Sequence, residues 1–207
     1  MSRATAREHR PRDAEATRRD LLRAAQRRFA VLGYDRTTTR DVADDAGVNL
    51  TLINRYFGGK RGLFEAAVAS APDLVAEYES DGGDVVAGFL DGLRPDAWPD
   101  FGGHHPLLLL LRDSSADAQI QALRSAAMAS AATRIAEVGG RDRGRAGSAR
   151  RREAELRAQL VLALFSGIIA LRSMAPTEPL ASADVDDLRG AIDDAITALI
   201  GPPRSGD

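Results

Sequence analysis

Apolar side chains recur at helical spacing along most of this 207-residue chain. In the first such segment they stand mostly three or four positions apart, which brings them to one face of a helix. They are Leu21, Leu22, Ala25, Phe29 and Leu32. This pattern predicts a helix that begins at Asp13 and ends at Gly33, because glycine readily adopts the left-handed conformation of a helix C-cap.

Further apolar segments follow after Pro72, separated by joints that contain glycine or proline. They predict helices over residues 74–93, 105–115, 116–138, 149–175 and 184–200. The last of these segments has a continuous apolar stripe. Because no segment shows the alternation of a strand, the sequence predicts an all-α protein.

Two short helices are predicted between the first helix and these later segments. Thr38 followed by Asp41 is a capping-box pattern, and it begins a helix over Thr39–Ala46. Asn49 is a favourable N-cap for a second helix over residues 50–57. Two short helices joined by a tight glycine-containing turn are typical of a helix-turn-helix, whose second helix enters the major groove of DNA.

The charge of the chain is divided unevenly, although its formal net charge is only −2. Residues 1–64 contain 14 basic and 8 acidic side chains, a balance of +6, and the remainder contains 14 and 22, a balance of −8. Such asymmetry indicates a polyanion-binding end joined to an acidic body, although chance scatter of solvated charges would also give it. Residues 1–12 have almost no apolar content and are predicted to form a disordered basic arm.

Several classes of function are disfavoured by what the sequence lacks. There are no cysteines, which excludes disulfides and thiolate chemistry, and none of the common hydrolase, metalloprotease or phosphate-loop motifs is present. We therefore expect no enzyme activity, no metal and no cofactor. The apolar run Leu160–Met174 is shorter than a membrane span and contains Arg172, and the basic start lacks the apolar core of a secretion signal, so we expect a cytoplasmic protein without membrane contact.

The run from Gly33 to Val68 resembles the N-terminal DNA-binding domain of the TetR family of transcription regulators. The resemblance covers about residues 15–68 and depends on many positions in order and spacing: Gly33, Thr38, Val42, Ala43, Ala46, Gly47, Val48, Tyr56, Phe57, Lys60 and Leu63. Gly59 is a departure, since the family commonly has a serine there that caps the next helix, and glycine is a tolerable substitute. The rest of the chain resembles the family's regulatory domain only in being helical and of suitable length.

The resemblance implies a particular domain organisation. After the arm of residues 1–12 comes a three-helix helix-turn-helix DNA-binding domain over 13–68. A larger helical ligand-binding and dimerisation domain covers 69–201, and residues 202–207 form a disordered tail. The helix that begins at Lys60 would be the only joint between the two domains and would couple them.

The predicted recognition helix has an apolar side and a polar side. Ile53 and Phe57 would pack inward, which leaves Asn54 free to bond adenine and Arg55 free to bond guanine or a phosphate. The family's backbone contacts and the helix starts add further candidates, each of which could also be an ordinary solvated surface residue. The predicted DNA-binding residues are Thr38, Thr39, Arg40, Asn49, Thr51, Asn54, Arg55, Tyr56 and Lys60.

One short recognition helix covers too few base pairs for useful specificity, so a homodimer on a palindrome of double-stranded DNA is expected. The dimer interface is predicted to come from residues 156–174 and 185–200. These two helices would form a four-helix bundle with the same two helices of the second copy. The segment from Leu160 is apolar on all sides, which a lone surface helix would not tolerate. The alternative is an internal helix of a monomer.

A cavity for an unidentified small-molecule ligand is expected between Leu74 and Met174. The candidate lining residues are Phe89, Trp98, His105, Leu108, Arg112 and Phe165. Each aromatic could instead fill the core, and Arg112 could pair with an anionic ligand or with a neighbouring aspartate.

The sequence thus predicts a sequence-specific transcription regulator, a repressor that a small-molecule ligand releases from a palindromic operator. One alternative is a helical dimeric ligand-binding or scaffold protein without specific operator recognition. Another is a nucleoid protein that binds DNA without sequence preference.

Overall fold

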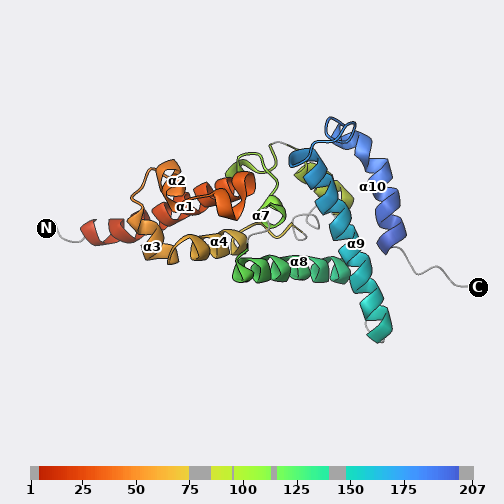
Figure 1. Ribbon diagram of the computed structural model, residues 1–207, viewed down its shortest axis with the longest axis horizontal. Coiled ribbons are helices and arrows are strands. Elements are labelled where there is room, and N and C mark those ends of the chain that lie inside the picture. The colour runs from red at the N-terminus through yellow and green to blue at the C-terminus, as the bar shows by residue number, and fades with distance from the viewer. Residues whose placement is uncertain (1–4, 75–84, 95, 113–115, 140–147, 201–207) are drawn as a thin grey trace, which may run out of the picture. The chain divides into compact units, whose positions relative to one another are not determined.

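A computed structural model of the chain describes residues 5–74, 85–94, 96–112, 116–139 and 148–200. All regular structure in these residues is helical (Figure 1), which confirms the all-α prediction. The predicted tail of residues 202–207 lies outside them.

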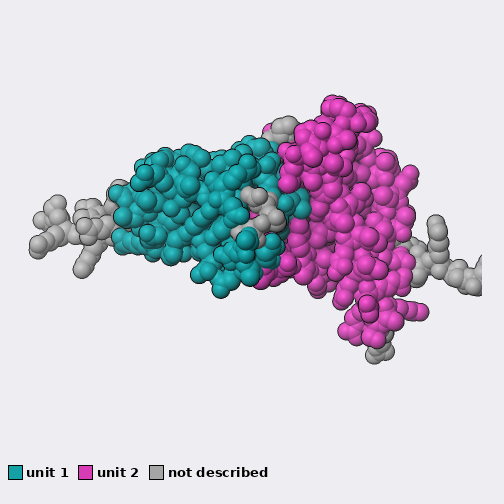
Figure 2. Space-filling model, in the orientation of Figure 1, with its two compact units in different colours: residues 1–71, 98–121 teal, residues 72–97, 122–207 magenta. Residues whose placement is uncertain are grey.

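The chain divides into two compact units (Figure 2). Unit 1 contains Met1–Ala71 and Trp98–Gln121, and unit 2 contains Pro72–Ala97 and Ala122–Asp207. The sequence predicts a single crossing near residue 68, whereas the chain passes between the units three times. The helix that begins at Lys60 is therefore not the only joint between them, and that expectation was wrong.

Unit 1 begins with α1, Thr5–Arg36, which Gly33 interrupts with a φ of 78° and a ψ of 177°. The break at Gly33 lies where the sequence predicts it, but the helix begins at Thr5, inside the predicted disordered arm, and not at Asp13. The next helices are α2 (Thr39–Asp45), α3 (Thr51–Phe57) and α4 (Lys60–Ala69).

Three aromatic rings form the centre of unit 1. Phe29 of α1 meets Phe64 of α4 edge to face at 5.0 Å between ring centroids, and Tyr34 meets Phe64 at 5.2 Å. Phe29 and Phe64 are fully buried. Edge-to-face pairs add to the gain from burying apolar area, so this cluster fixes α4 against α1.

Residues from later in the chain complete unit 1. They form the 3-10 helix η1 (Pro99–Phe101), the short helix α7 (Leu108–Leu111) and the first residues of α8 (Ala118–Gly139), and η1 and α7 pack on α1. Residues 113–115 of the predicted helix over 105–115 lie outside the described residues, and within 105–112 the α-helix is limited to α7. Its apolar residues occupy every position instead of one face, so they give no helical period.

Unit 2 contains α6 (Val85–Gly92), most of α8, α9 (Ser148–Ser173) and α10 (Val185–Ile200). Figure 1 shows α9 and α10 side by side, and the two helices are in contact. Arg172 of α9 donates from Nη1 to the carbonyl oxygens of Leu180 and Ala183, at 2.8 and 2.9 Å, and so holds the connection that leads into α10.

The helix α9 is longer than the apolar run that the sequence suggests. With 26 residues it is long and apolar enough to cross a membrane by length and composition, and 28% of its most apolar window is buried inside the structure. The length argument from the shorter run Leu160–Met174 was therefore wrong, because the whole helix is long enough to span a membrane. Val161, Phe165 and Ile169 are buried and give α9 an inward face within unit 2.

Candidate DNA-binding site

The start of α2 is fixed by the predicted capping box. Thr38 Oγ1 accepts a hydrogen bond from the Asp41 N–H at 3.1 Å, and Asp41 Oδ2 accepts from the Thr38 N–H at 3.3 Å. Thr38 Oγ1 also donates to Asp41 Oδ2 at 2.6 Å. These bonds from Thr38 lower the pKa of Asp41, so its carboxylate stays ionised beside the positive end of the helix. Next to this cap, Thr39 is half-buried and Arg40 is exposed.

Asn49 supplies the side-chain cap of α3. Its Oδ1 accepts from the Thr51 N–H at 2.8 Å and from Thr51 Oγ1 at 2.7 Å. By backbone geometry the N-cap is Leu50, which has no side-chain cap bond, and the helix begins at Thr51. The predicted N-cap position was therefore wrong by one residue, although the Asn49 side chain does bond the first residue of the helix. Both polar side chains are exposed and lie together at the beginning of the helix.

The two faces of α3 differ as the sequence predicts. Ile53 is fully buried, whereas Asn54 and Arg55 are exposed. Tyr56 and Phe57 are half-buried, so Phe57 packs inward only in part. The Arg55 guanidinium lies 6.0 Å from the centre of the Tyr56 ring. The exposed face therefore presents an amide and a guanidinium on consecutive residues.

A close backbone approach joins α3 to α4. A Cβ added at Gly62 would lie 1.9 Å from the Phe57 carbonyl oxygen, which is too short for any side chain. Gly59, the N-cap of α4, has a φ of 118° and no side-chain cap bond. The sequence did not identify Gly62, although a glycine inside a helical pattern is a general sign of close packing.

Lys60 is held inside unit 1. Its Nζ donates to the Asp35 carbonyl oxygen at 3.1 Å and lies 4.4 Å from the centre of the Tyr34 ring. Burial lowers the pKa of its amine. An ammonium has three donors, so these contacts leave capacity for a phosphate, and the predicted DNA contact of Lys60 stays a prediction.

Two further contacts hold the helix-turn-helix on α1. Arg28 forms a two-bond ion pair with Asp45 at 2.6 and 2.8 Å, and the Arg18 guanidinium lies 5.2 Å from the centre of the Phe57 ring. Sequence reasoning missed both, because residues this far apart along the chain give no local pattern.

The six predicted ligand-binding residues fall into two groups. Trp98, His105, Leu108 and Arg112 belong to unit 1, and Phe89 and Phe165 belong to unit 2. Phe89 and Phe165 stack on each other with centroids 3.7 Å apart. Phe89 is fully buried and Phe165 is 4% exposed, so within unit 2 these rings fill the core.

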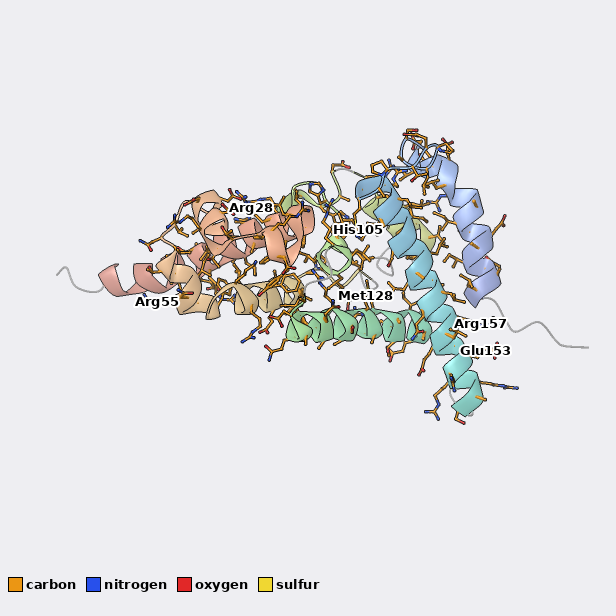
Figure 3. All side chains as sticks on the ribbon, viewed as in Figure 1. Arg28, Arg55, His105, Met128, Glu153 and Arg157 are labelled. Atoms are coloured by element: carbon orange, nitrogen blue, oxygen red, sulfur yellow. The ribbon has the colours of Figure 1, made fainter. Side chains whose placement is uncertain are left out.

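Among the six predicted residues, His105 is a buried histidine of unit 1 (labelled in Figure 3). It is 6% exposed, and burial lowers its pKa to about 3. Its Nδ1 accepts from the Leu107 N–H at 3.1 Å, and its ring meets Trp98 at 5.5 Å between centroids. The ring is therefore neutral at physiological pH and helps to form the local core.

A hollow of about 470 Å³ lies on unit 1, and none of these six residues lines it. It is lined by Ala16, Arg19, Asp20, Leu22, Arg23, Gln26, Ser70 and Asp100. In the described part of the chain, no three histidine or acidic side chains come together as metal ligands.

These features define a helix-turn-helix DNA-binding protein: two short capped helices, a polar face on the second, and a third helix packed closely behind it. The sequence model described as "Bacterial regulatory proteins, tetR family" matches residues 21–67. The model described as "Tetracyclin repressor-like, C-terminal domain" matches residues 95–200, which is more than half of the chain. The chain belongs to the TetR family and is a DNA-binding transcription regulator.

Solved structures of similar fold support the architecture. The complex of SmeT with triclosan has a TM-score of 0.63 at 20% identity, over 93% of this chain and 98% of that one. A transcriptional regulator from Saccharomonospora viridis in complex with choline has a TM-score of 0.61 at 22% identity, with coverages of 88% and 96%. NalD of Pseudomonas aeruginosa, a repressor of the MexAB-OprM multidrug efflux pump, has a TM-score of 0.57 at 18% identity, with coverages of 88% and 96%. At these identities the likeness shows the fold alone, and no curated protein matches the chain.

Proposed function

We propose that this protein is a repressor that binds a palindromic operator through α3 and is released by a small-molecule ligand. The observation that supports this most directly is the division of α3, with Ile53 fully buried and Asn54 and Arg55 exposed. In that arrangement the helix packs on its own domain and offers hydrogen-bonding groups to the major groove at the same time.

The site residues fall into two roles in this proposal. Asn54 and Arg55 contact base edges, since an amide pairs with adenine and a guanidinium with guanine. The other predicted residues fix the protein on the phosphate backbone through hydroxyl, amide and ammonium donors, and they add affinity without sequence preference. They are Thr38, Thr39, Arg40, Asn49, Thr51, Tyr56 and Lys60.

A homodimer through α9 and α10 supplies the second half-site. Leu156, Leu160, Leu171 and Met174 are the large apolar side chains that stand exposed in the described chain, at 56%, 47%, 40% and 39%. All four lie on α9 or directly after it. Burial of this surface against a second copy would remove it from water and explain why a helix of such apolar character is tolerated.

The ligand response is proposed from the family and from the layout of unit 1. SmeT with triclosan and the S. viridis protein with choline show that members of this fold hold small molecules. In this chain, η1 and α7 pack on α1, and the Arg61 side chain of α4 donates to the Gln119 side chain at the start of α8. A ligand that moved this segment would move the DNA-binding helices, and the DNA in turn would change ligand affinity by the same factor.

This function requires that the protein reach DNA, so we place it in the cytoplasm. Regulators of this family are generally not enzymes, and we propose no catalytic residue.

Substitution of Arg55 tests the role of α3. Arg55→Ala should weaken binding to the operator by roughly 1–3 kcal/mol while binding to unrelated DNA changes little. The matched control is Arg152→Ala, which removes the same charge from an exposed position of α9. Equal weakening by both variants would show that Arg55 contributes only bulk charge. Equal weakening of operator and unrelated DNA by Arg55→Ala would favour binding without sequence preference.

A further inference from the structure

A two-bond ion pair joins α1 to the last residue of α2 (Figure 3 labels Arg28). The Arg28 Nε donates to Asp45 Oδ2 at 2.6 Å, and its Nη2 donates to Asp45 Oδ1 at 2.8 Å. The two side chains are 29% and 36% exposed, so the pair is partly shielded from solvent. Paired guanidinium and carboxylate groups in this geometry are strong and directional.

The charges around the pair keep it ionised. The hydrogen bond from Arg28 lowers the pKa of Asp45, and the carboxylate raises the pKa of Arg28. Asp41 and Asp44, on the same helix, act on Arg28 in the same direction. The guanidinium is therefore favoured electrostatically by three carboxylates of α2 and contacts one of them, Asp45.

The helix α2 depends on such outside contacts for its orientation. It has only 7 residues, and an isolated helix of that length is not stable in water. Its beginning is fixed by the Thr38–Asp41 box, and its middle by the burial of Val42 and Ala43. Its last turn has no basic residue of its own, and Arg28 supplies from α1 the positive charge that the helix C-terminus favours.

We propose that Arg28 is a positioning residue for operator recognition. Its two bonds to Asp45 fix the end of α2, and the short turn that follows fixes where α3 begins. The exposed Asn54 and Arg55 are thereby held in one orientation before DNA is bound. This inference depends on the proposed function of α3, and Arg28 itself is not assigned a contact with DNA.

The pair can be altered without a change in net charge. In Arg28→Lys the positive charge remains, but an ammonium lacks the planar fork that makes two bonds to one carboxylate. The matched control is Arg23→Lys, on the same helix, whose ion pairs with Asp20 and Asp100 are more exposed and include no residue of α2.

The experiment compares affinities for a palindrome selected by the wild-type protein and for unrelated duplex DNA at one salt concentration. Arg28→Lys should lose roughly five- to tenfold in affinity for the palindrome and almost nothing for unrelated DNA, while Arg23→Lys should match the wild type. Asp45→Asn should lose a similar factor, and the double variant Arg28→Lys with Asp45→Asn should lose no more than either single variant, since both remove the same contact.

Hydrogen exchange of the α2 backbone amides gives a second readout, and it should accelerate in Arg28→Lys with an unchanged melting temperature. If Arg28→Lys binds the palindrome as tightly as the wild type, or loses affinity equally for both DNAs, the positioning role is wrong and the proposed function stands. If the wild-type protein selects no palindrome, both proposals fail.

Discussion

The two units differ in how completely they enclose their apolar side chains. In unit 1 the rings of Phe29 and Phe64 are fully buried, and side-chain hydrogen bonds hold the beginnings of α2 and α3. In unit 2, by contrast, α9 buries Val161 and Ile169 on one side and leaves Leu156 and Leu160 about half exposed on another.

This difference indicates what each unit needs from outside. Unit 1 buries its aromatic core side chains by itself and exposes polar groups on α3, which suits a polar partner such as DNA. Unit 2 exposes an apolar surface, and contact with another apolar surface would remove it from water. The predictions below test this contrast, beginning with the largest expected effect.

Charging the exposed face of α9 should abolish the dimer. Leu160→Glu with Leu171→Glu places two carboxylates on one side of the helix, and the lost burial of two leucines amounts to roughly 3–6 kcal/mol. Light scattering at micromolar concentration should give one protomer for this variant and two for the wild type. Ala129→Glu, at an exposed position of α8, is the control and should stay dimeric. A wild-type mass of one protomer would contradict the dimer.

A methyl group at Gly62 should disrupt unit 1. Gly62→Ala places a Cβ against the Phe57 carbonyl oxygen, and because the obstructing atom is backbone, α3 must move. We expect a loss of about 3 kcal/mol in the free energy of unfolding and a loss of operator binding. Glu65→Ala, which changes an exposed side chain of α4, is the control. Unchanged operator binding by Gly62→Ala would show that the close approach does not position α3.

Acidification should destabilise unit 1 through His105. Its pKa is about 3 in the folded protein against about 6.5 when unfolded, so the neutral ring favours folding above pH 6.5, and this contribution is lost as the pH falls from 6.5 towards 3. Between pH 7.5 and 5 the loss is about 2 kcal/mol, measurable by denaturant unfolding at fixed protein concentration. His105→Asn keeps an acceptor for the Leu107 N–H and does not titrate, so its stability should depend less on pH. An equal slope for both proteins would exclude His105 as the source.

The smallest expected effect concerns the cap of α2. Thr38→Ala removes the side-chain acceptor of the Asp41 N–H and should cost about 1 kcal/mol in the free energy of unfolding. Thr133→Ala is the comparison in unit 2, because this exposed threonine lies inside α8 and bonds only to the Ala129 carbonyl oxygen. It should change stability little, since alanine is the better helix former. Equal losses would mean that the cap has no special role.

Features set by neighbouring residues were predictable from the sequence. The Thr38–Asp41 box and the break at Gly33 occur where the pattern places them, and Asn49 bonds the start of α3 although the N-cap itself is Leu50. Each of these features depends on residues within a few positions of one another. Burial of Ile53 beside exposed Asn54 and Arg55 followed from helical spacing in the same way.

Features set by distant residues were not predictable. The Arg28–Asp45 pair and the approach of Gly62 to Phe57 depend on how helices pack, and no local pattern encodes that packing. The sequence assigned residues 98–121 to the regulatory part of the chain, and the C-terminal family model covers them, but by their contacts they pack in unit 1. The predicted ligand-binding residues were chosen as one set, and the structure divides them between the two units.

The central claim is sequence-specific recognition by a dimer through α3. The most direct test is selection by the purified protein from random duplex DNA at moderate salt. We predict an enriched palindrome whose half-site centres lie about 34–36 Å apart or somewhat more, and whose enrichment is lost in Arg55→Ala. A folded dimer that binds all duplexes equally, with an affinity that depends only on salt, would contradict this account.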